Sequence, residues 1–136
     1  MTPTAILETA LYADDLDAVE AFYVGVLGFA VYGRVPGRHV FFKCGNQMLL
    51  VFNPTATEVS ATSAKLPVPV HGARGNGHVC FRADAAEIEA WKTHLLGKGV
   101  VIEADFVWPS GGRSIYFRDP AGNSIEFAEP RIWGIG

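Results

Sequence analysis

The chain has 136 residues, of which 49% are hydrophobic and 18% are charged. This balance predicts one compact domain over residues 1–136 with a buried core, and it excludes a disordered chain. The formal net charge of −3 argues against binding to nucleic acid or anionic membranes, because such binding needs a basic surface. No apolar run has the length of a membrane span, and residues 1–4 show no signal-peptide pattern, so we expect a cytoplasmic protein.

The first half of the chain predicts a strand, a helix and three further strands. Residues 4–13 are strand-like, and Asp14 or Asp15 is expected to cap a helix over 15–27, whose apolar residues recur at helical spacing. Gly28 is expected to end this helix. Three strand-like runs separated by glycines follow, at residues 30–34, 39–44 and 48–53.

The second half predicts the same order of elements. A strand over 77–83 leads to Asp84, which is expected to cap a helix over 85–96, with Glu87 completing a capping box. Three strand-like runs then follow, at residues 100–106, 113–118 and 124–128. Such a repeat of architecture indicates duplication, and neither copy is expected to bury its sheet alone.

The sequence therefore predicts an α+β fold of two βαβββ modules, 4–53 and 77–130, whose sheets form one cupped, open barrel. The connection over 54–76 is rich in Pro, Ser, Thr, Ala and Gly and has no apolar period. It is interpreted either as a plain linker or as a flap over a site. Cys44 and Cys80 have no metal-ligand spacing and are expected to be buried free thiols.

Alternation along the predicted strands turns three ionisable side chains to the face away from the helices. Glu8 and His78 occupy the same place in the first strand of each module, and Glu126 lies in the last strand of the second. Two carboxylates and an imidazole on one face suit a divalent cation. The alternative is a structural ion network in which the carboxylates pair with Arg82 or Arg113.

Three segments resemble the vicinal-oxygen-chelate superfamily of glyoxalases, bleomycin-resistance proteins and extradiol dioxygenases. Glu8 is followed by an apolar strand end, Asp-Leu, and a helix with Phe-Tyr and Leu-Gly-Phe, as at the opening of these proteins. The sequence Asn-Gly-His-Val at 76–79 resembles the start of their second module. Asp-Pro-Ala-Gly-Asn at 119–123 resembles the hairpin that precedes the last ligand.

The resemblance implies a metal site formed by Glu8, His78 and Glu126, holding Zn, Ni, Mn or Fe. The chain departs from the family at two positions. His is usual where this chain has Glu8, although Glu or Gln occurs there in some members. Glyoxalase I enzymes take a fourth ligand from the last strand of the first module, where this chain offers only Gln47. One His and two carboxylates leave open positions for water or substrate.

The implied function is a metal-dependent, glyoxalase-like lyase or isomerase that chelates a small oxygen-rich substrate, working as a homodimer. Glu126 and Tyr116 are the candidate catalytic residues. Superfamily dioxygenases and thiol-transferring resistance enzymes resemble this chain in placing a Tyr ten residues before the last ligand, and the alternative is that Tyr116 is a packed aromatic of the strand. One alternative is an extradiol-type dioxygenase, which would need a second His. The other is a drug- or ligand-sequestering binding protein, which would need no metal.

Further side chains are candidates for contact with the substrate, each with a structural alternative. These candidates are Tyr12 as a cleft wall, Arg82 on the same strand face as His78, Trp108 at a cleft mouth, and Arg113 as a partner for a substrate carboxylate. His71 and Arg74 lie in the connection and either close over substrate or have no role. His39 and His94 are expected to be surface residues.

Overall fold

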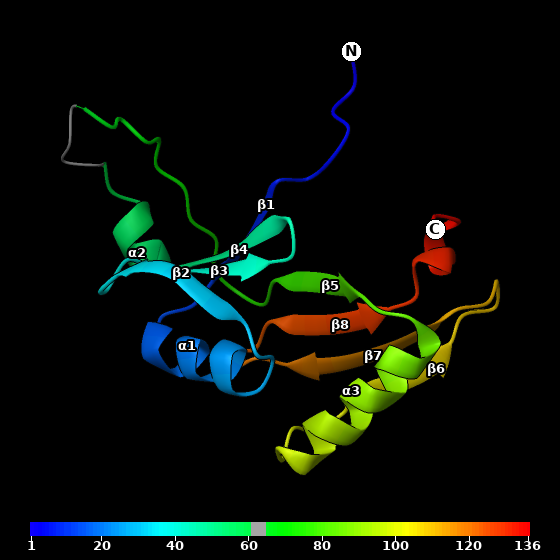
Figure 1. Ribbon diagram of the computed structural model, residues 1–136. Coiled ribbons are helices and arrows are strands. Elements are labelled where there is room, and N and C mark those ends of the chain that lie inside the picture. Colours follow the sequence, from blue (N-terminus) through cyan, green and yellow to red (C-terminus); the bar gives the residue numbers. More distant parts are fainter. Residues whose placement is uncertain (61–64) are drawn as a thin grey trace. The chain divides into compact units, whose positions relative to one another are not determined.

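The computed structural model describes residues 1–60 and 65–136, which divide into two compact units, Met1–Gly75 and Asn76–Gly136. Each unit contains one four-stranded sheet and one long helix, so the predicted α+β fold with a repeated βαβββ order is confirmed (Figure 1). None of the helices in the described part of the chain is both long and apolar enough to cross a membrane.

The first unit contains a sheet with the strand order β1-β4-β3-β2, in which β1 pairs in parallel with β4 and the other pairs are antiparallel. Its elements are β1 (Glu8–Tyr12), α1 (Leu16–Gly25), β2 (Ala30–Val35), β3 (His39–Cys44), β4 (Gln47–Phe52) and the short α2 (Pro54–Thr57). β1 begins later than predicted, and α1 is shorter than the predicted range of 15–27.

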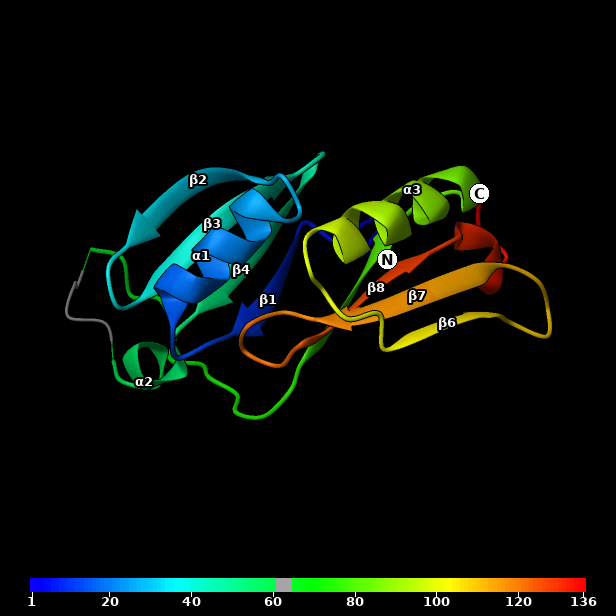
Figure 2. The ribbon, with the colours of Figure 1, turned by 90° about the horizontal axis from the view of Figure 1, so that it is seen from below.

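Helix α1 begins where Asp15 accepts a hydrogen bond from the Ala18 backbone at 3.0 Å, which decides between the two predicted caps. Its buried face includes Val19 and Tyr23, both fully buried. Tyr23 packs against Phe42 of β3 with ring centroids 5.3 Å apart. The helix therefore covers one face of the sheet, as Figure 2 shows, and leaves the opposite face to other residues.

The register of the sheet fixes which side chains share that opposite face. Pairing places Tyr12 beside Phe52 and Phe52 beside His39, while the next row along the strands joins Ala10, Leu50 and Phe41. Because side chains alternate along a strand, these residues point away from α1. Aromatic rings therefore dominate the face away from α1 at this end of the sheet.

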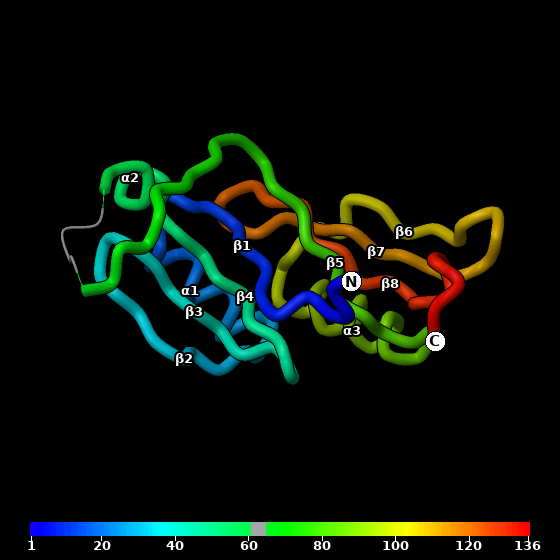
Figure 3. The backbone as a smooth tube through the Cα atoms, turned by 90° about the horizontal axis from the view of Figure 1, so that it is seen from above, coloured from blue at the N-terminus to red at the C-terminus, as the bar shows by residue number. Residues whose placement is uncertain are grey.

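The chain after β4 contains a short helix that the sequence analysis missed. The side chain of Asn53 accepts from the Thr55 backbone at 3.0 Å, and Pro54 occupies the first helical position, where no amide hydrogen is needed. The backbone then returns past the end of β1 (Figure 3), where the His71 amide donates to the Thr57 carbonyl at 3.0 Å. Residues 68–71 thus lie beside the first sheet, where His71 is held by this hydrogen bond.

The second unit repeats the topology, with the strand order β5-β8-β7-β6 and a parallel β5–β8 pair. Its elements are β5 (His78–Arg82), α3 (Ala85–Gly97), β6 (Ala104–Val107), β7 (Arg113–Arg118), β8 (Ser124–Ala128) and a 3-10 helix, η1 (Pro130–Trp133). The predicted capping box is present, because Asp84 and Glu87 exchange hydrogen bonds of 2.7 and 2.8 Å. Strand β6 was predicted to begin at residue 100, and it begins four residues later, at residue 104.

Helix α3 covers one face of this second sheet (Figure 2). Trp91 of the helix stacks on Phe127 of β8 with centroids 4.6 Å apart, and Ile88, Ile115 and Ile125 are fully buried. Burying these large apolar side chains supplies the main stabilisation of the unit. Residues of the opposite parity on β5, β7 and β8 therefore face away from α3.

Candidate metal and substrate site

The face of the second sheet away from α3 brings together two predicted metal ligands. Register places Glu126 between Cys80 of β5 and Tyr116 of β7, and places His78 beside Ser124. The Nε2 atom of His78 lies 3.3 Å from Oε2 of Glu126. His78 and Glu126 therefore lie on the same face of the second sheet, as strand alternation predicted.

The His78 ring is held in one tautomer by the strand beside it. Its Nδ1 atom lies 3.0 Å from the carbonyl oxygen of Ser124. A carbonyl only accepts hydrogen bonds, so Nδ1 must carry the proton. A neutral His78 then presents the Nε2 lone pair, which is the atom and charge state that metal ions bind.

The Glu126 carboxylate is buried, with 5% of the residue exposed. Its Oε1 atom has no hydrogen-bond partner among the residues that the structure describes. Leaving a buried acceptor unsatisfied costs about 1–3 kcal/mol, and more when the group is charged. A cation bound at this oxygen would remove that cost, so His78 and Glu126 together fit a divalent metal.

Two neighbours of Glu126 respond to its charge. Burial, together with hydrogen bonding and repulsion from the Glu126 carboxylate, raises the pKa of Tyr116 to about 12. The Tyr116 hydroxyl is therefore protonated at neutral pH and able to donate a hydrogen bond. Desolvation and the same carboxylate raise the pKa of Cys80 to about 12, which keeps the thiol protonated.

Both cysteines are free, but Cys80 is exposed and Cys44 only half-buried, so the prediction of buried thiols was wrong.

An aromatic row flanks the carboxylate on the same face. The His78 and Tyr116 rings lie 6.3 Å apart at an interplanar angle of 22°, and Phe106 stacks on Tyr116 at 5.9 Å. Trp108 packs edge-on against Phe106, and its Nε1 donates to Ser114 Oγ at 2.8 Å. Trp108 thus lies at the end of a row that begins at His78.

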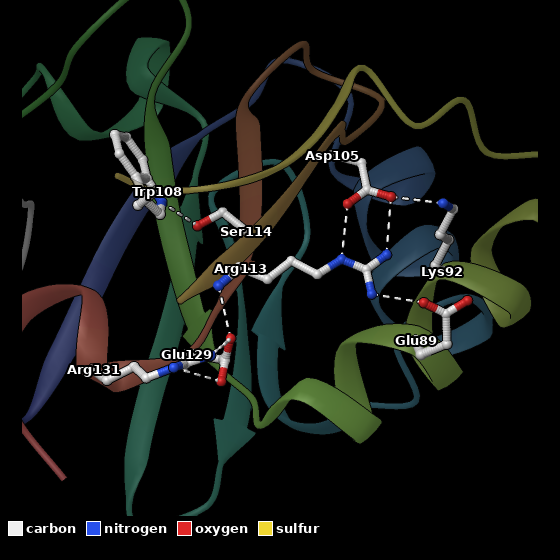
Figure 4. Close-up of polar contacts among 8 residues, drawn as sticks. All are labelled: Glu89, Lys92, Asp105, Trp108, Arg113, Ser114, Glu129 and Arg131. Atoms are coloured by element: carbon white, nitrogen blue, oxygen red, sulfur yellow. Dashed lines mark hydrogen bonds and ion pairs between the residues drawn. The ribbon is translucent and has the colours of Figure 1, made fainter. Parts of the chain in front are cut away.

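Arg113 and Arg82 have different surroundings in the second unit. The Arg113 guanidinium pairs with Asp105 at 2.8 Å and with Glu89 of α3 at 2.6 Å, so it lies on the helix side of the sheet (Figure 4). Arg113 is therefore part of a structural ion network with Asp105 and Glu89. Arg82 is exposed on the face that carries His78 and has no ion pair among the described residues.

Glu8, the third predicted ligand, is exposed in β1 of the first unit, with the parity of Ala10 and Tyr12. Register places it beside Met48, and Gln47 has the opposite parity. Gln47 is therefore on the helix side and does not supply a fourth ligand. Among the described residues, neither unit by itself brings three or more His, Cys, Asp or Glu side chains close enough together to hold a metal ion. The convergence of Glu8 with His78 and Glu126 therefore stays a prediction.

The first unit contains a cavity of about 640 Å³ on the face away from α1. Its floor is formed by β1, β3 and β4, and residues 68–71 close one side, which favours the flap interpretation of this part of the connection. The full lining is Glu8, Ala10, Tyr12, Arg38, His39, Phe41, Leu50, Phe52, Val68, Pro69, Val70 and His71. Tyr12 thus lines a cavity wall, as proposed from its parity.

Sequence reasoning missed most of this cavity. His39 was expected on the surface, but it is half-buried and stacks on Phe41 with centroids 3.9 Å apart. His71 packs edge-on against Phe52 at 4.6 Å, and its Nδ1 lies 2.8 Å from the Tyr12 hydroxyl. Alternation of residues 39, 41, 50 and 52 was the available signal. Arg74, also in the connection, instead pairs with exposed Glu58 at 2.7 Å.

Comparison with known proteins agrees with this architecture. Residues 5–127 match the model of the Glyoxalase/Bleomycin resistance protein/Dioxygenase superfamily. The crystal structure of lactoylglutathione lyase from Agrobacterium tumefaciens is 50% identical and has a TM-score of 0.94, over 99% of this chain and 100% of that one. No functionally curated protein matches the chain significantly.

More distant structures share the fold. A glyoxalase/bleomycin resistance protein/dioxygenase from Nocardioides is 22% identical with a TM-score of 0.73, over 95% of this chain and 85% of that one. A virulence protein from Salmonella typhimurium is 25% identical with a TM-score of 0.69, over 95% and 98% of the two chains. This chain therefore belongs to the Glyoxalase/Bleomycin resistance protein/Dioxygenase superfamily, as the family match, the structure with 50% sequence identity and the repeated βαβββ units all indicate.

Proposed function

We propose that the protein is a metal-dependent, glyoxalase-like lyase or isomerase acting on a small oxygen-rich substrate. The observation that carries the proposal is the pair formed by His78 and the buried Glu126, whose Oε1 atom has no partner among the described residues. Identity of 50% to a lactoylglutathione lyase over the full chain supports the class of reaction.

The proposed ligands are Glu8, His78 and Glu126. A divalent cation, Zn, Ni, Mn or Fe, would supply Lewis-acid stabilisation of vicinal substrate oxygens when bound there. The Ser124 carbonyl orients the His78 ring for this role, because it fixes the proton on Nδ1. The shortage of His residues, with only His78 in the set, argues against the extradiol-type alternative.

Two side chains are proposed to handle protons and charge. Tyr116 faces Glu126 across the β7–β8 pair, so its hydroxyl is placed to donate a hydrogen bond to a substrate oxyanion near that carboxylate. Glu126 is the proposed base, because a ligand carboxylate lies beside the substrate oxygens and can accept a proton with the oxygen that does not bind the cation. Tyr12, Arg82 and Trp108 are proposed substrate contacts around this centre.

Chelation and restoration of activity test the proposal. Protein treated with a chelator should lose lactoylglutathione lyase activity, or activity on a related substrate found by screening, and should regain it with one of the four cations. Glu126→Gln should be inactive, whereas Glu129→Gln changes a buried carboxylate held by Arg131 and should remain active. Tight ligand binding without turnover or metal would instead support a ligand-sequestering protein.

We also propose that the protein works as a homodimer in the cytoplasm, with a small molecule as its substrate. Homodimers with twofold symmetry are the commonest oligomers of soluble proteins. Light scattering over a range of concentrations tests the assembly. A mass equal to one chain at every concentration would contradict it.

A further inference from the structure

The cavity of the first unit has two chemically different ends. Glu8, at the start of β1, lines one end of the cavity, and Tyr12, at the end of the same strand, lines the other. A strand rises about 3.3 Å per residue, so the two ends are separated by roughly 13 Å. Arg38 precedes His39, which lies in the row of Tyr12 and Phe52, so the cation is at the end away from Glu8.

Between these ends the cavity has an aromatic floor. The Phe41 and Phe52 rings contact edge-on at 5.4 Å, and His39 stacks on Phe41 at an angle of 8°. The opposite side is apolar, because Val68, Pro69 and Val70 line it. Such walls favour a flat, unsaturated body over a flexible hydrated chain, since ring faces gain from stacking.

Arg38 forms no ion pair with a carboxylate among the described residues. Five of the seven arginines pair with a carboxylate, and these are Arg34, Arg74, Arg113, Arg118 and Arg131. Arg38 instead donates to His39 Nδ1 at 2.8 Å and lies 5.8 Å from the centroid of the Phe52 ring. Guanidinium groups have no acceptor, so His39 accepts here and is neutral. A half-buried cation without a carboxylate suits an anionic ligand.

We propose that this cavity is a substrate subsite for an aromatic or conjugated carboxylate, whose anionic group pairs with Arg38 and whose unsaturated body lies over Phe41 and Phe52. The proposal rests on the proposed function in one respect: the ligand's reactive oxygens would lie at the Glu8 end. The substrate class thus becomes an elongated molecule with chelating oxygens at one end and a carboxylate at the other.

Calorimetric titration of the chelator-treated full chain with trans-cinnamate tests the subsite without a metal. Cinnamate should bind saturably, and Arg38→Gln should weaken binding by about 10- to 100-fold, the range expected for losing a charged hydrogen bond. Arg38→Lys should restore part of the affinity. Arg34→Gln is the matched control, because Arg34 is exposed and paired with Glu20, and it should bind cinnamate as the wild type does.

Three further probes separate the chemical features. Cinnamyl alcohol, which lacks the anion, should bind weakly and equally to wild type and Arg38→Gln. The saturated anion 3-cyclohexylpropionate should bind more weakly than cinnamate, and so should S-methylglutathione, an anion without a ring. Absence of cinnamate binding in the millimolar range, equal binding to Arg38→Gln, or preference for either non-aromatic anion would overturn the proposal.

Failure of this proposal is distinguishable from failure of the proposed function. If cinnamate does not bind but the chain holds a cation through His78 and Glu126, only the subsite is refuted. If cinnamate binds through Arg38 but no cation binds at His78 and Glu126, the metalloenzyme proposal is refuted and the subsite stands.

Discussion

The hydroxyl of Tyr12 lies 2.8 Å from Nδ1 of His71, although 59 residues separate the two in the chain. The contact ties the segment after α2 to the end of β1, beside the His71–Thr57 backbone hydrogen bond. Both side chains also line the cavity of the first unit. One hydrogen bond therefore links the covering segment to the cavity wall.

Tyr12→Phe should loosen this segment while keeping the ring that packs 6.2 Å from Phe52. Loss of the hydrogen bond should lower the free energy of unfolding by about 0.5–1.5 kcal/mol. Hydrogen exchange at the His71 amide, measured by NMR, should become faster. Tyr32→Phe is the control, because Tyr32 is 70% exposed. Unchanged exchange at His71 would show that the contact does not hold the segment.

Asp105→Asn should make the protein less stable at neutral pH by about 1 kcal/mol. Hydrogen bonds from Arg113 and Lys92 hold the pKa of Asp105 well below its ordinary value (Figure 4). A lowered pKa adds stability above the ordinary value of 3.8, and this stability is lost as the pH falls further towards the folded pKa.

The difference between wild type and Asp105→Asn should therefore shrink as the pH falls below about 4, in urea unfolding at several pH values. Glu103→Gln is the control, because Glu103 pairs with Arg118 at a more exposed site and should have a smaller effect. A difference that is constant with pH would contradict the role given to the Asp105 charge.

Gly112→Ala should destabilise the protein more than Gly111→Ala. Both glycines have left-handed backbones, with φ of 91° and 92°, so the strain of adding a side chain is shared, at about 1–2 kcal/mol. A Cβ on Gly112 would meet Ile132 Cγ2 at 2.5 Å, whereas on Gly111 the nearest atom is 3.6 Å away. Equal melting temperatures of the two variants would show that Ile132 of η1 moves without cost.

The order of elements was predictable because local signals agree with it. The box formed by Asp84 and Glu87 marks the start of α3, and the structure contains it. The start of β6 was not predictable from composition. Residues 100–102 are apolar like a strand, but the Val100 amide bonds the Leu95 carbonyl, so this stretch completes the exit from α3.

Strand parity also predicted that His78 and Glu126 share a face, since alternation needs no knowledge of strand pairing. The cavity at Arg38 was missed. Its floor depends on the register that places His39 beside Phe52, and its cover depends on residues 68–71 returning to β1. The first belongs to the β3–β4 hairpin, where strand alternation gave a signal. The second is a contact between segments distant in sequence, which local patterns do not encode.

Tyr116→Phe should lower turnover, or weaken binding of an oxyanion ligand, without changing metal content. The phenol faces Glu126 across β7 and β8, and Phe keeps the stacking on Phe106 while removing only the donor. Steady-state kinetics with parallel elemental analysis measures both quantities. If every ligand and kinetic measurement is unchanged, Tyr116 is a packing residue.

Elemental analysis of metal per chain tests the central claim most directly. Wild-type protein, loaded with Zn, Ni, Mn or Fe(II) and then desalted, should retain one cation per chain, held at roughly 2.0–2.3 Å by its ligands. His78→Ala and Glu126→Gln should retain none, and Glu8→Gln should retain less, with only modest loss of thermal stability. His94→Ala, an exposed His on α3, should retain as much metal as wild type. Equal metal content in wild type, His78→Ala and Glu126→Gln would contradict the metal centre proposed for these residues.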